Sequence, residues 1–303
     1  MRESLDSAVR IAVPATYVVA VTLIAAELLL LRARHHLPRL RALFTSLGSG
    51  ALSFGLMALA SALLYARVLD AAYAHRAFTL GTSAGAWLAA FVLYDLSFWI
   101  AHVAGHRVRA LWCFHSVHHS TAEMSLTAAI RGSAADFLYL PWFFVWVPLL
   151  GVHPAMLLVV ESASRTWGVL THVSPRLVGR LGPLEGVVVT PSAHRVHHGT
   201  ELAYLDRNYG EVLALWDRLF GTYAPEVEAP RYGLLTPLAD DALATVQLTP
   251  WRALLRDLRR APGWGARLRY LFDAPGWSHD GPDQRVTTVR RAAAQRPAPG
   301  AHA

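Results

Sequence analysis

Long apolar runs alternate along the chain with short polar stretches. Residues 9–31, 47–66 and 85–101 are each close to the ~20 apolar residues that a helix needs to cross a bilayer. A fourth apolar region, residues 134–171, is long enough for two passes, and the Gly-Val-His-Pro turn at residues 151–154 divides it into runs 134–150 and 154–170. The pattern predicts an all-α integral membrane protein with four to five transmembrane helices.

Arginines crowd the loop after the first apolar run, at Arg32, Arg34, Arg39 and Arg41. By the positive-inside rule this loop lies in the cytoplasm, so the amino terminus lies outside. Counting the runs forward puts residues 101–133 and everything after residue 171 on the cytoplasmic side. Every histidine-rich segment is then expected in one cytosolic helical cap.

The region after residue 171 has ordinary polarity and contains one amphipathic pattern. Trp251, Leu254, Leu255 and Leu258 recur at helical spacing opposite several arginines, which suits a basic helix lying on the membrane surface. A helix packed on the rest of the cytosolic region fits the pattern equally well. From residue 278 onward the chain is rich in proline, arginine and alanine without periodicity, which predicts a disordered tail.

Composition supports the membrane interpretation and narrows the chemistry. The chain is 54% hydrophobic and only 16% charged, and its net charge of +7 comes from arginine without any lysine. Beside apolar spans, this excess favours anionic lipid headgroups over nucleic acid. Cys113 is the only cysteine, which excludes an intrachain disulfide and any multi-cysteine metal site. The first apolar run is too long for a signal-peptide core, so we expect a retained span.

Eight of the fifteen histidines fall at helical spacing, and a ninth lies alone at the end of the last apolar run. One pair is four residues apart, and two triplets share the i, i+3, i+4 pattern, so each set lies on one helix face. Thr190 and Pro191 resemble an N-cap and a first helical residue, and Gly199 a stop, which predicts a short helix for the last triplet. The nine are His102 and His106; His115, His118 and His119; the isolated His172; and His194, His197 and His198.

Such a cluster is better explained by metal than by structural roles. Protonated rings would repel one another, whereas a metal takes one ring nitrogen and leaves one N–H for a hydrogen-bond acceptor. Nine imidazoles exceed the four ligands of one tetrahedral zinc, so the natural count is two ions. Imidazole binds zinc, copper, iron and nickel, so ligand type alone leaves the metal open.

Six motifs in order carry a family resemblance, from about Asp95 to Tyr223. They are DLSFWIAHVAGH, LWCFHSVHHS, TAAIRG, THVS, VTPSAHRVHHG and DRNYGEVLALWDRLFGTY. Together they resemble the fatty acid hydroxylase/sterol desaturase superfamily of membrane di-iron enzymes, and PGW at residues 275–277 resembles its bacterial members. Val103 stands where that family usually has arginine, and Val173-Ser174 where it commonly has Ser-Asn, but all matched histidines remain.

The resemblance implies an O2-dependent lipid hydroxylase or desaturase that acts on an unactivated C–H bond at the cytoplasmic face. It implies two iron ions on the nine histidines, with zinc as an alternative occupant in purified material, and O2 as co-substrate. The substrate would be a sterol, a fatty acyl chain or a related lipid. No nicotinamide or flavin fingerprint is visible, so electrons would come from an external donor of the cytochrome b5 or ferredoxin type. Arginine in place of lysine suggests a bacterial inner membrane.

The resemblance also implies a domain plan and some accessory residues. Residues 1–84 would form N-terminal spans, 85–225 the catalytic domain, 226–277 a cytosolic amphipathic region and 278–303 the tail. Beyond the ligands no catalytic group is expected. From its position two turns before His102, Asp95 is separately expected to orient a ligand histidine or to pair with an arginine. By the resemblance, Asp206 and Asn208 are expected to lie near the metals, and a loop cap for the following helix is the alternative.

Other interpretations stay open at this point. Glu161 and Arg165, four residues apart in an apolar run, predict a buried ion pair or a polar contact with substrate. A membrane di-zinc lipid hydrolase would use metal-activated water and a base such as Glu123, Glu201 or Asp206. A haem-carrying electron-transfer protein would use two histidines and leave seven unexplained.

Overall fold

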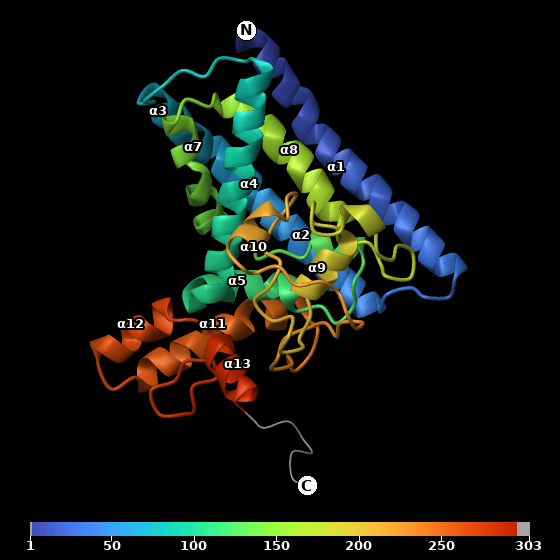
Figure 1. Ribbon diagram of the computed structural model, residues 1–303, viewed down its shortest axis with the longest axis vertical. Helices are drawn as coiled ribbons and strands as arrows, with labels where there is room; N and C mark the ends of the chain where they lie inside the picture. The colour runs from blue at the N-terminus through green and yellow to red at the C-terminus, as the bar shows by residue number, and fades with distance from the viewer. Residues whose placement is uncertain (1, 296–303) are drawn as a thin grey trace.

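The computed structural model describes residues 2–295 of the chain. This part is all-helical: it holds α- and 3-10 helices, one short π-helical turn and isolated β-bridges, and no β-strand. Helices run along one axis in the upper half and become short and irregular in the lower half (Figure 1). The predicted all-α class is confirmed.

Three helices are long and apolar enough to cross a membrane. The first is α1 (Arg2–Ala33). The second is a continuous run of α2 (Leu40–Ala60), a π-helical turn (Ser61–Tyr65) and α3 (Ala66–Ala74). The third is α4 (Ala84–Arg107), which carries two of the histidines at its lower end. Large apolar side chains on these helices, such as Val18, Leu59 and Leu88, are exposed, as a lipid-facing surface requires.

Residues 134–170, expected to supply the remaining one or two transmembrane helices, hold no helix as long as these three. Residues 134–150 form 3-10 turns (Asp136–Leu138 and Leu140–Phe144) and one turn of helix, α7 (Trp146–Leu149). Prolines at 141 and 148 each remove a backbone donor, which interrupts a continuous helix. The segment still climbs the bundle, because Ala77 N donates to Leu149 O at 2.8 Å at the upper end.

The last apolar run does form a helix, α8 (Pro154–Leu170), but its 17 residues are shorter than the three candidate spans. It descends beside α1 to the histidine level (Figure 1). Irregular backbone at membrane depth is tolerated where protein surrounds it. The broken segment meets this condition, since Phe144 and Val147 are buried in the same core cluster as Tyr94 of α4.

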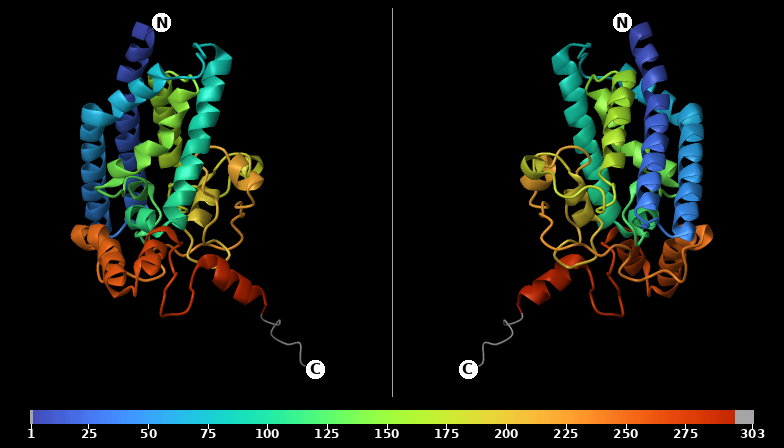
Figure 2. Two further views of the ribbon diagram at one scale, coloured as in Figure 1. Left: turned by 90° about the vertical axis from the view of Figure 1, so that its left-hand side faces the viewer. Right: turned by 90° about the vertical axis from the view of Figure 1, so that its right-hand side faces the viewer.

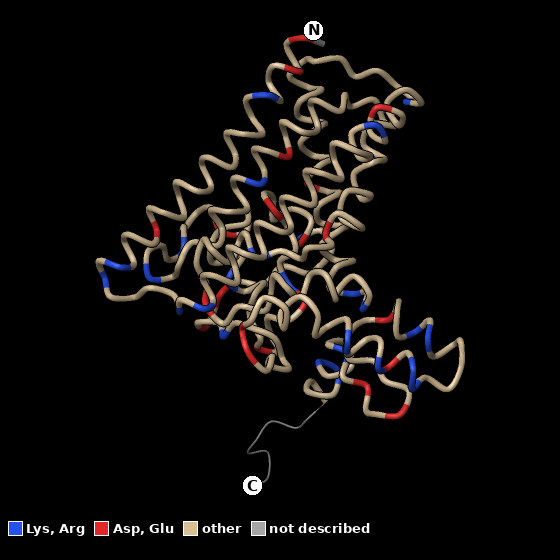
Figure 3. Tube along the Cα trace, turned by 180° about the vertical axis from the view of Figure 1, so that it is seen from behind, with Lys and Arg blue, Asp and Glu red and all other residues tan. Residues whose placement is uncertain are grey.

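The lower half holds the histidine-bearing segments, joined by short helices. These are α5 (Arg109–His119), α6 (Leu126–Ala129), α9 (Pro191–His197) and α10 (Leu215–Leu219). A buried carboxylate of α1 ties two of their connections to the bundle: Glu27 accepts hydrogen bonds from Leu126 N at 2.6 Å and Ser174 N at 2.8 Å. Positive charge in the α1–α2 loop lies at this same end (Figure 3).

The C-terminal region consists of α11 (Leu243–Arg260), α12 (Trp264–Phe272) and α13 (Val286–Ala294). The apolar face of α11 packs on α5, with Leu254 buried in a cluster around Cys113, so the packed-helix interpretation of this pattern is the correct one. The expected disordered tail is wrong for α13, where Arg290 donates to Leu202 O and Leu205 O. The rest of that tail, residues 296–303, lies outside the described residues.

Candidate metal centre

All nine histidines singled out by their spacing converge at the lower end of the bundle. In each group below, one potential ligand atom from every residue lies within 4.8 Å of the others. The rings of His119 and His198 stack at 4.3 Å and connect the two groups. The first group is His102, His106, His115, His119 and His197; the second is His118, His172, His194 and His198.

Local structure explains how the last triplet is presented. Thr190 accepts a hydrogen bond from Ala193 N at 3.2 Å and caps α9, and Pro191 takes the first helical position. The helix ends at His197, and Gly199 follows it where an added Cβ would lie 2.9 Å from the Tyr204 side chain. The predicted short helix, its cap and its stop are confirmed, and the helix is buried throughout.

Within each group the Nε2 atoms face one another at hydrogen-bond distance. In the first group, His119 Nε2 lies 3.2 Å from that of His115 and 3.1 Å from that of His197. In the second, Nε2 of His172 lies 2.8 Å from His194 and 3.1 Å from His118. Nε2 of His198 is 3.1 Å from that of His194. Several rings therefore direct the same nitrogen toward a common centre.

Backbone carbonyls hold the opposite nitrogen of three rings. His102 Nδ1 donates to Tyr209 O at 2.7 Å, His197 Nδ1 to Arg207 O at 2.9 Å and His172 Nδ1 to Gly168 O at 2.7 Å. A carbonyl oxygen only accepts, so these Nδ1 atoms carry the proton and leave a bare lone pair on Nε2. Nε2 of His102 and of His106 is buried without a hydrogen-bond partner among the described residues. These lone pairs need a cation.

Burial keeps the rings outside the spans neutral. Burial, together with the nearby His106, lowers the pKa of His197 to about 3. Burial also lowers the pKa of His172 to about 4. The pKa values of the remaining rings of α5 and α9 fall well below the ordinary value of 6.5 for the same reason. At neutral pH the site presents uncharged imidazoles, the form that binds metal.

Asp206 and Asn208, the two loop residues expected near the metals, have different surroundings. Asp206 lies beside the first group, with Oδ1 3.6 Å from His106 Nδ1, in a loop where its φ is +54°. Asn208, also at φ +54°, bonds to backbone groups: its amide donates to Ala193 O and Ala224 O and accepts from Ala224 N. Asn208 therefore joins two backbone segments and does not cap the following helix, whereas Asp206 lies beside a grouped histidine.

Asp95 does not orient a histidine and does not pair with an arginine, contrary to both expectations. Its carboxylate accepts hydrogen bonds from Val212 N at 3.0 Å, Leu213 N at 3.4 Å and Trp216 Nε1 at 2.9 Å. It acts on the site only through the loop that follows Tyr209. Because Asp95 and His102 lie two turns apart on one helix face, their spacing suggested that they interact. Instead, the loop containing Val212 and Leu213 supplies the hydrogen-bond donors to the Asp95 carboxylate.

Asp217 is the carboxylate that the sequence analysis missed. It is buried and accepts from Tyr209 N at 2.9 Å, Gly210 N at 2.8 Å, Thr222 Oγ1 at 2.6 Å and Trp99 Nε1 at 3.1 Å. The Tyr209 carbonyl in turn holds His102. Asp217 lies in the quoted motif DRNYGEVLALWDRLFGTY, but its spacing from the histidines gives no sign of this role.

A charged cluster borders the site inside the bundle. Arg165 Nε lies 3.7 Å from Glu161, which confirms the expected pairing, although both side chains are 33% exposed and the pair is not buried. Arg165 Nη1 lies 3.5 Å from Glu211. Glu211 follows Gly210 in the loop and is buried. The guanidinium also lies 5.2 Å from the ring centre of Phe98, which contacts the His102 ring.

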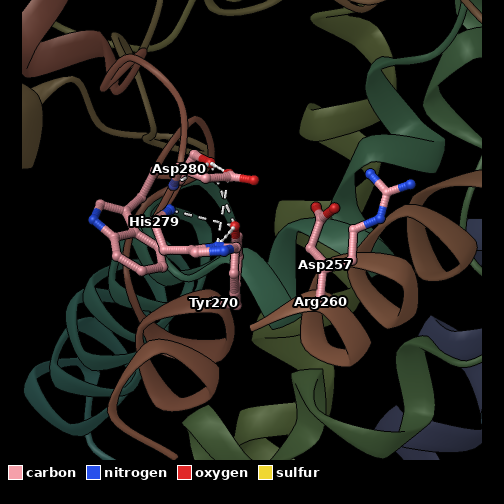
Figure 4. Close-up of a pocket in the computed structure, with 7 residues that line it drawn as sticks. Asp257, Arg260, Tyr270, His279 and Asp280 are labelled. Atoms are coloured by element: carbon pink, nitrogen blue, oxygen red, sulfur yellow. Dashed lines mark hydrogen bonds and ion pairs between the residues drawn. The ribbon is translucent and has the colours of Figure 1, made fainter. Parts of the chain in front are cut away.

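A separate small pocket lies away from the histidines, between α11, α12 and the chain after α12 (Figure 4). Asp257, Tyr270 and Trp277 line it, and Tyr270 hydrogen-bonds to His279 Nδ1 at 2.8 Å. None of the nine grouped histidines lines this pocket.

Comparison with known proteins agrees with the site. Residues 87–222 match the model of the family described as fatty acid hydroxylase. Alkylglycerol monooxygenase of Xenopus tropicalis is 36% identical over 152 residues, 50% of this chain and 33% of that protein. The human protein of that name is 35% identical over 50% of this chain and 34% of its own length. Ornithine lipid hydroxylase OlsE of Rhizobium tropici is 30% identical over 50% of this chain and 46% of its own length.

The chain thus spans about a third of the length of the alkylglycerol monooxygenases that it matches, at 33% and 34%. No solved structure gives a significant match. The matched region contains all nine histidines and the loop that holds them. Through residues 87–222 the chain belongs to the fatty acid hydroxylase/sterol desaturase superfamily.

Proposed function

We propose that the nine histidines hold two iron ions and that the protein uses O2 to hydroxylate or desaturate an unactivated C–H bond of a membrane lipid. The observation that carries this proposal is the convergence of ring nitrogens in two groups of five and four histidines, within 4.8 Å of one another in each group. When bound, the metal pair would supply the activation of O2. An external donor of the cytochrome b5 or ferredoxin type would supply electrons.

The number of rings in the first group favours a metal that accepts more than four ligands, because its five potential ligand atoms all lie within 4.8 Å of one another and tetrahedral zinc takes four. Nε2 pairs in both groups lie 2.8–3.2 Å apart, so several rings of a group could bind one ion.

The chain's own groups fix the ligands before any metal arrives. The carbonyls of Arg207, Tyr209 and Gly168 set the tautomer of three rings, and Asp206 lies beside a fourth, His106. Outer partners of this kind raise ligand basicity and orient the ring. Asp95 and Asp217 secure the loop that provides two of the carbonyls.

The site's position suits a lipid substrate and a soluble electron donor. His102 and His106 lie in the last two turns of a membrane-crossing helix, so the groups lie where the bilayer core ends. A lipid chain can reach them from the bilayer, and a donor can dock on the water side. We assign that side to the cytoplasm because the arginine-rich α1–α2 loop shares this end. We assign the membrane to a bacterial inner membrane because the chain uses arginine and no lysine.

The hydrolase interpretation has less support from the structure. Of its three candidate bases, Glu123 pairs with Arg39 and Glu201 with Arg231. Only Asp206 lies beside a grouped histidine. A haem protein would need two axial rings, whereas each group here has at least four.

The test is metal content and lipid-dependent O2 uptake of purified protein produced in iron-replete cells. We expect about two irons per chain, as two histidine groups imply. His197→Ala and His118→Ala each remove a ring from a different group, and both should lower the iron content and abolish O2 uptake. His279→Ala is the matched control, because this histidine is hydrogen-bonded to Tyr270 outside both groups and should leave both measurements unchanged.

Zinc in both groups without O2 uptake in the presence of iron would overturn the oxygenase proposal in favour of hydrolysis. A Soret band in the absorption spectrum would favour haem instead. Iron content that stays at the wild-type level in His197→Ala and His118→Ala would reject the ligand assignment itself.

A further inference from the structure

One part of the nominally cytosolic region rises beside α4 into the bundle. The chain leaves the histidines at Tyr209, whose carbonyl binds His102, and reaches Asp95 with its Val212 and Leu213 amides. It then returns past Trp99, which donates to Asp217 and stacks on Phe220 at 4.6 Å. Figures 1 and 2 show α10 beside α4 well above the lower end of that helix.

The depth of residues 212–220 in the membrane can be estimated from the residues of α4 that they contact. Asp95 lies at the midpoint of α4 (Ala84–Arg107), about 18 Å along the axis from its lower end. The hydrocarbon core is about 30 Å thick, so a residue midway along a spanning helix lies near its centre. Trp99 lies one turn lower, about 12 Å from that end. The Asp95 and Trp99 contacts therefore place residues 212–220 at membrane depth.

Residues 187–189 lie beside residues 212–214 and are hydrogen-bonded to them. Val189 N donates to Val212 O at 2.8 Å, and Ala214 N donates to Val187 O at 3.1 Å. We call residues 184–188 together with residues 212–220 the re-entrant edge. Its outward side chains are large and apolar, and 46–65% of each is exposed. These side chains are Leu184, Val187, Leu215, Leu219 and Phe220.

The polar groups behind this surface are satisfied from within the protein. Asp217 and Asp95 accept the backbone N–H groups of residues 209, 210, 212 and 213. Backbone donors at membrane depth must find protein acceptors, because hydrocarbon supplies none. In water the same amides could bond to solvent, so two buried carboxylates used for this purpose point to a site without water.

One exposed charged side chain lies on the edge, and its geometry is compatible with lipid, while Asp217 is buried and Glu185 accepts hydrogen bonds from Leu181 N, Thr190 Oγ1 and Ser192 Oγ. Arg218 is exposed, and its guanidinium lies 4.8 Å from the ring centre of Tyr223, which follows α10 as the chain returns downward. A long arginine side chain can keep its apolar stem in hydrocarbon while its head reaches the interface.

We propose that the re-entrant edge is embedded in the bilayer and contacts lipid acyl chains directly, continuing the lipid-facing surface of α4. The alternative occupants are water and a partner protein. Depth, exposed apolar side chains and internally satisfied amides all favour hydrocarbon. The lipid boundary then reaches the outer side of the loop that holds His102, and the region after residue 171 is not wholly cytosolic. The inference rests on the membrane-spanning helices and is independent of the proposed reaction.

The test uses single thiols labelled with the fluorophore NBD on the full protein in lipid nanodiscs. Cys113 is the only native cysteine and is buried, so an introduced exposed cysteine can be labelled selectively. Leu215→Cys and Leu219→Cys report on the edge. Leu88→Cys, exposed on α4, is the lipid control, and Val227→Cys, exposed in the loop after α10, is the water control. Each variant is first checked for wild-type thermal melting.

Quenching by nitroxide-labelled lipids and by aqueous iodide separates the outcomes. We expect the two edge positions to behave as position 88 does, with strong quenching by the lipid nitroxides and several-fold weaker quenching by iodide than at position 227. Iodide quenching equal to that at position 227 would show that water covers the edge. Protection from both quenchers would show that protein covers it. Either result overturns the proposal.

Discussion

At the scale of single residues, the site is prepared by acceptors that are not ligands. Backbone carbonyls from residues 168, 207 and 209 set three ring tautomers, and buried carboxylates secure the loop that carries two of them. These three imidazoles therefore present Nε2 as the free nitrogen before any metal binds. Asp217 is the residue on which most of this arrangement depends, since it accepts two consecutive backbone amides and two side-chain donors.

Replacing Asp217 with asparagine should destabilise the protein. The new amide keeps one acceptor oxygen but turns an N–H₂ group toward backbone donors, and a buried donor left without an acceptor costs about 2 kcal/mol. We expect a lower melting temperature and, because Tyr209 O holds His102, less bound metal. Asp70→Asn on the exposed face of α3 is the control and should melt as wild type does. Equal melting of the two variants would contradict this role.

At the scale of elements, an amphipathic pattern shows that a helix has an apolar face but not what that face contacts. The apolar stripe of α11 suits a membrane surface as well as a protein surface, yet Leu254 is buried against α5 and its neighbour Leu255 is exposed. The broken segment 136–149 shows the converse: an apolar run of spanning length fails to form a helix because prolines interrupt it and protein surrounds it. Apolar composition alone does not identify what an element contacts.

Truncating two adjacent leucines of α11 tests this packing. Leu254→Ala removes a fully buried side chain from the cluster around Cys113, and such truncations cost about 3 kcal/mol because a cavity remains. Leu255→Ala removes an exposed side chain of the same type and should change stability little. Thermal unfolding in one detergent measures both. A larger loss for Leu255→Ala would mean that the exposed face of α11, rather than the packed one, carries its stabilising contacts.

At the scale of the whole molecule, the order of passes fixes which ends share a membrane face. α1 descends, α2 and α3 rise, α4 descends, residues 134–150 rise and α8 descends, so the α3–α4 loop lies opposite the histidines (Figures 1 and 2). The arginine-rich loop after α1 lies at the histidine end, which the positive-inside rule assigns to the cytoplasm.

Labelling of intact cells with a membrane-impermeant thiol reagent tests this topology. Phe78→Cys places an exposed thiol in the α3–α4 loop and should react from outside the intact cytoplasmic membrane. Val227→Cys, exposed at the histidine end, should react only after that membrane is permeabilised. The wild-type chain, whose single cysteine is buried, sets the background. The reverse labelling order would invert the topology and with it the proposed docking side of the electron donor.

The sequence by itself determined the helical class, the three long spans, the capped helix of the last triplet and the membership of all nine histidines in one site. Each follows from local periodicity or from a quoted motif, which short stretches of chain encode completely. The division of the rings into groups of five and four, the partners of Asp95 and Asp217 and the height of α10 were decided only by the tertiary structure. Several of these features depend on contacts between residues far apart in the chain, such as Asp95 with Trp216. No periodicity reports such a contact, because it forms only after the bundle has brought the loop to the helix.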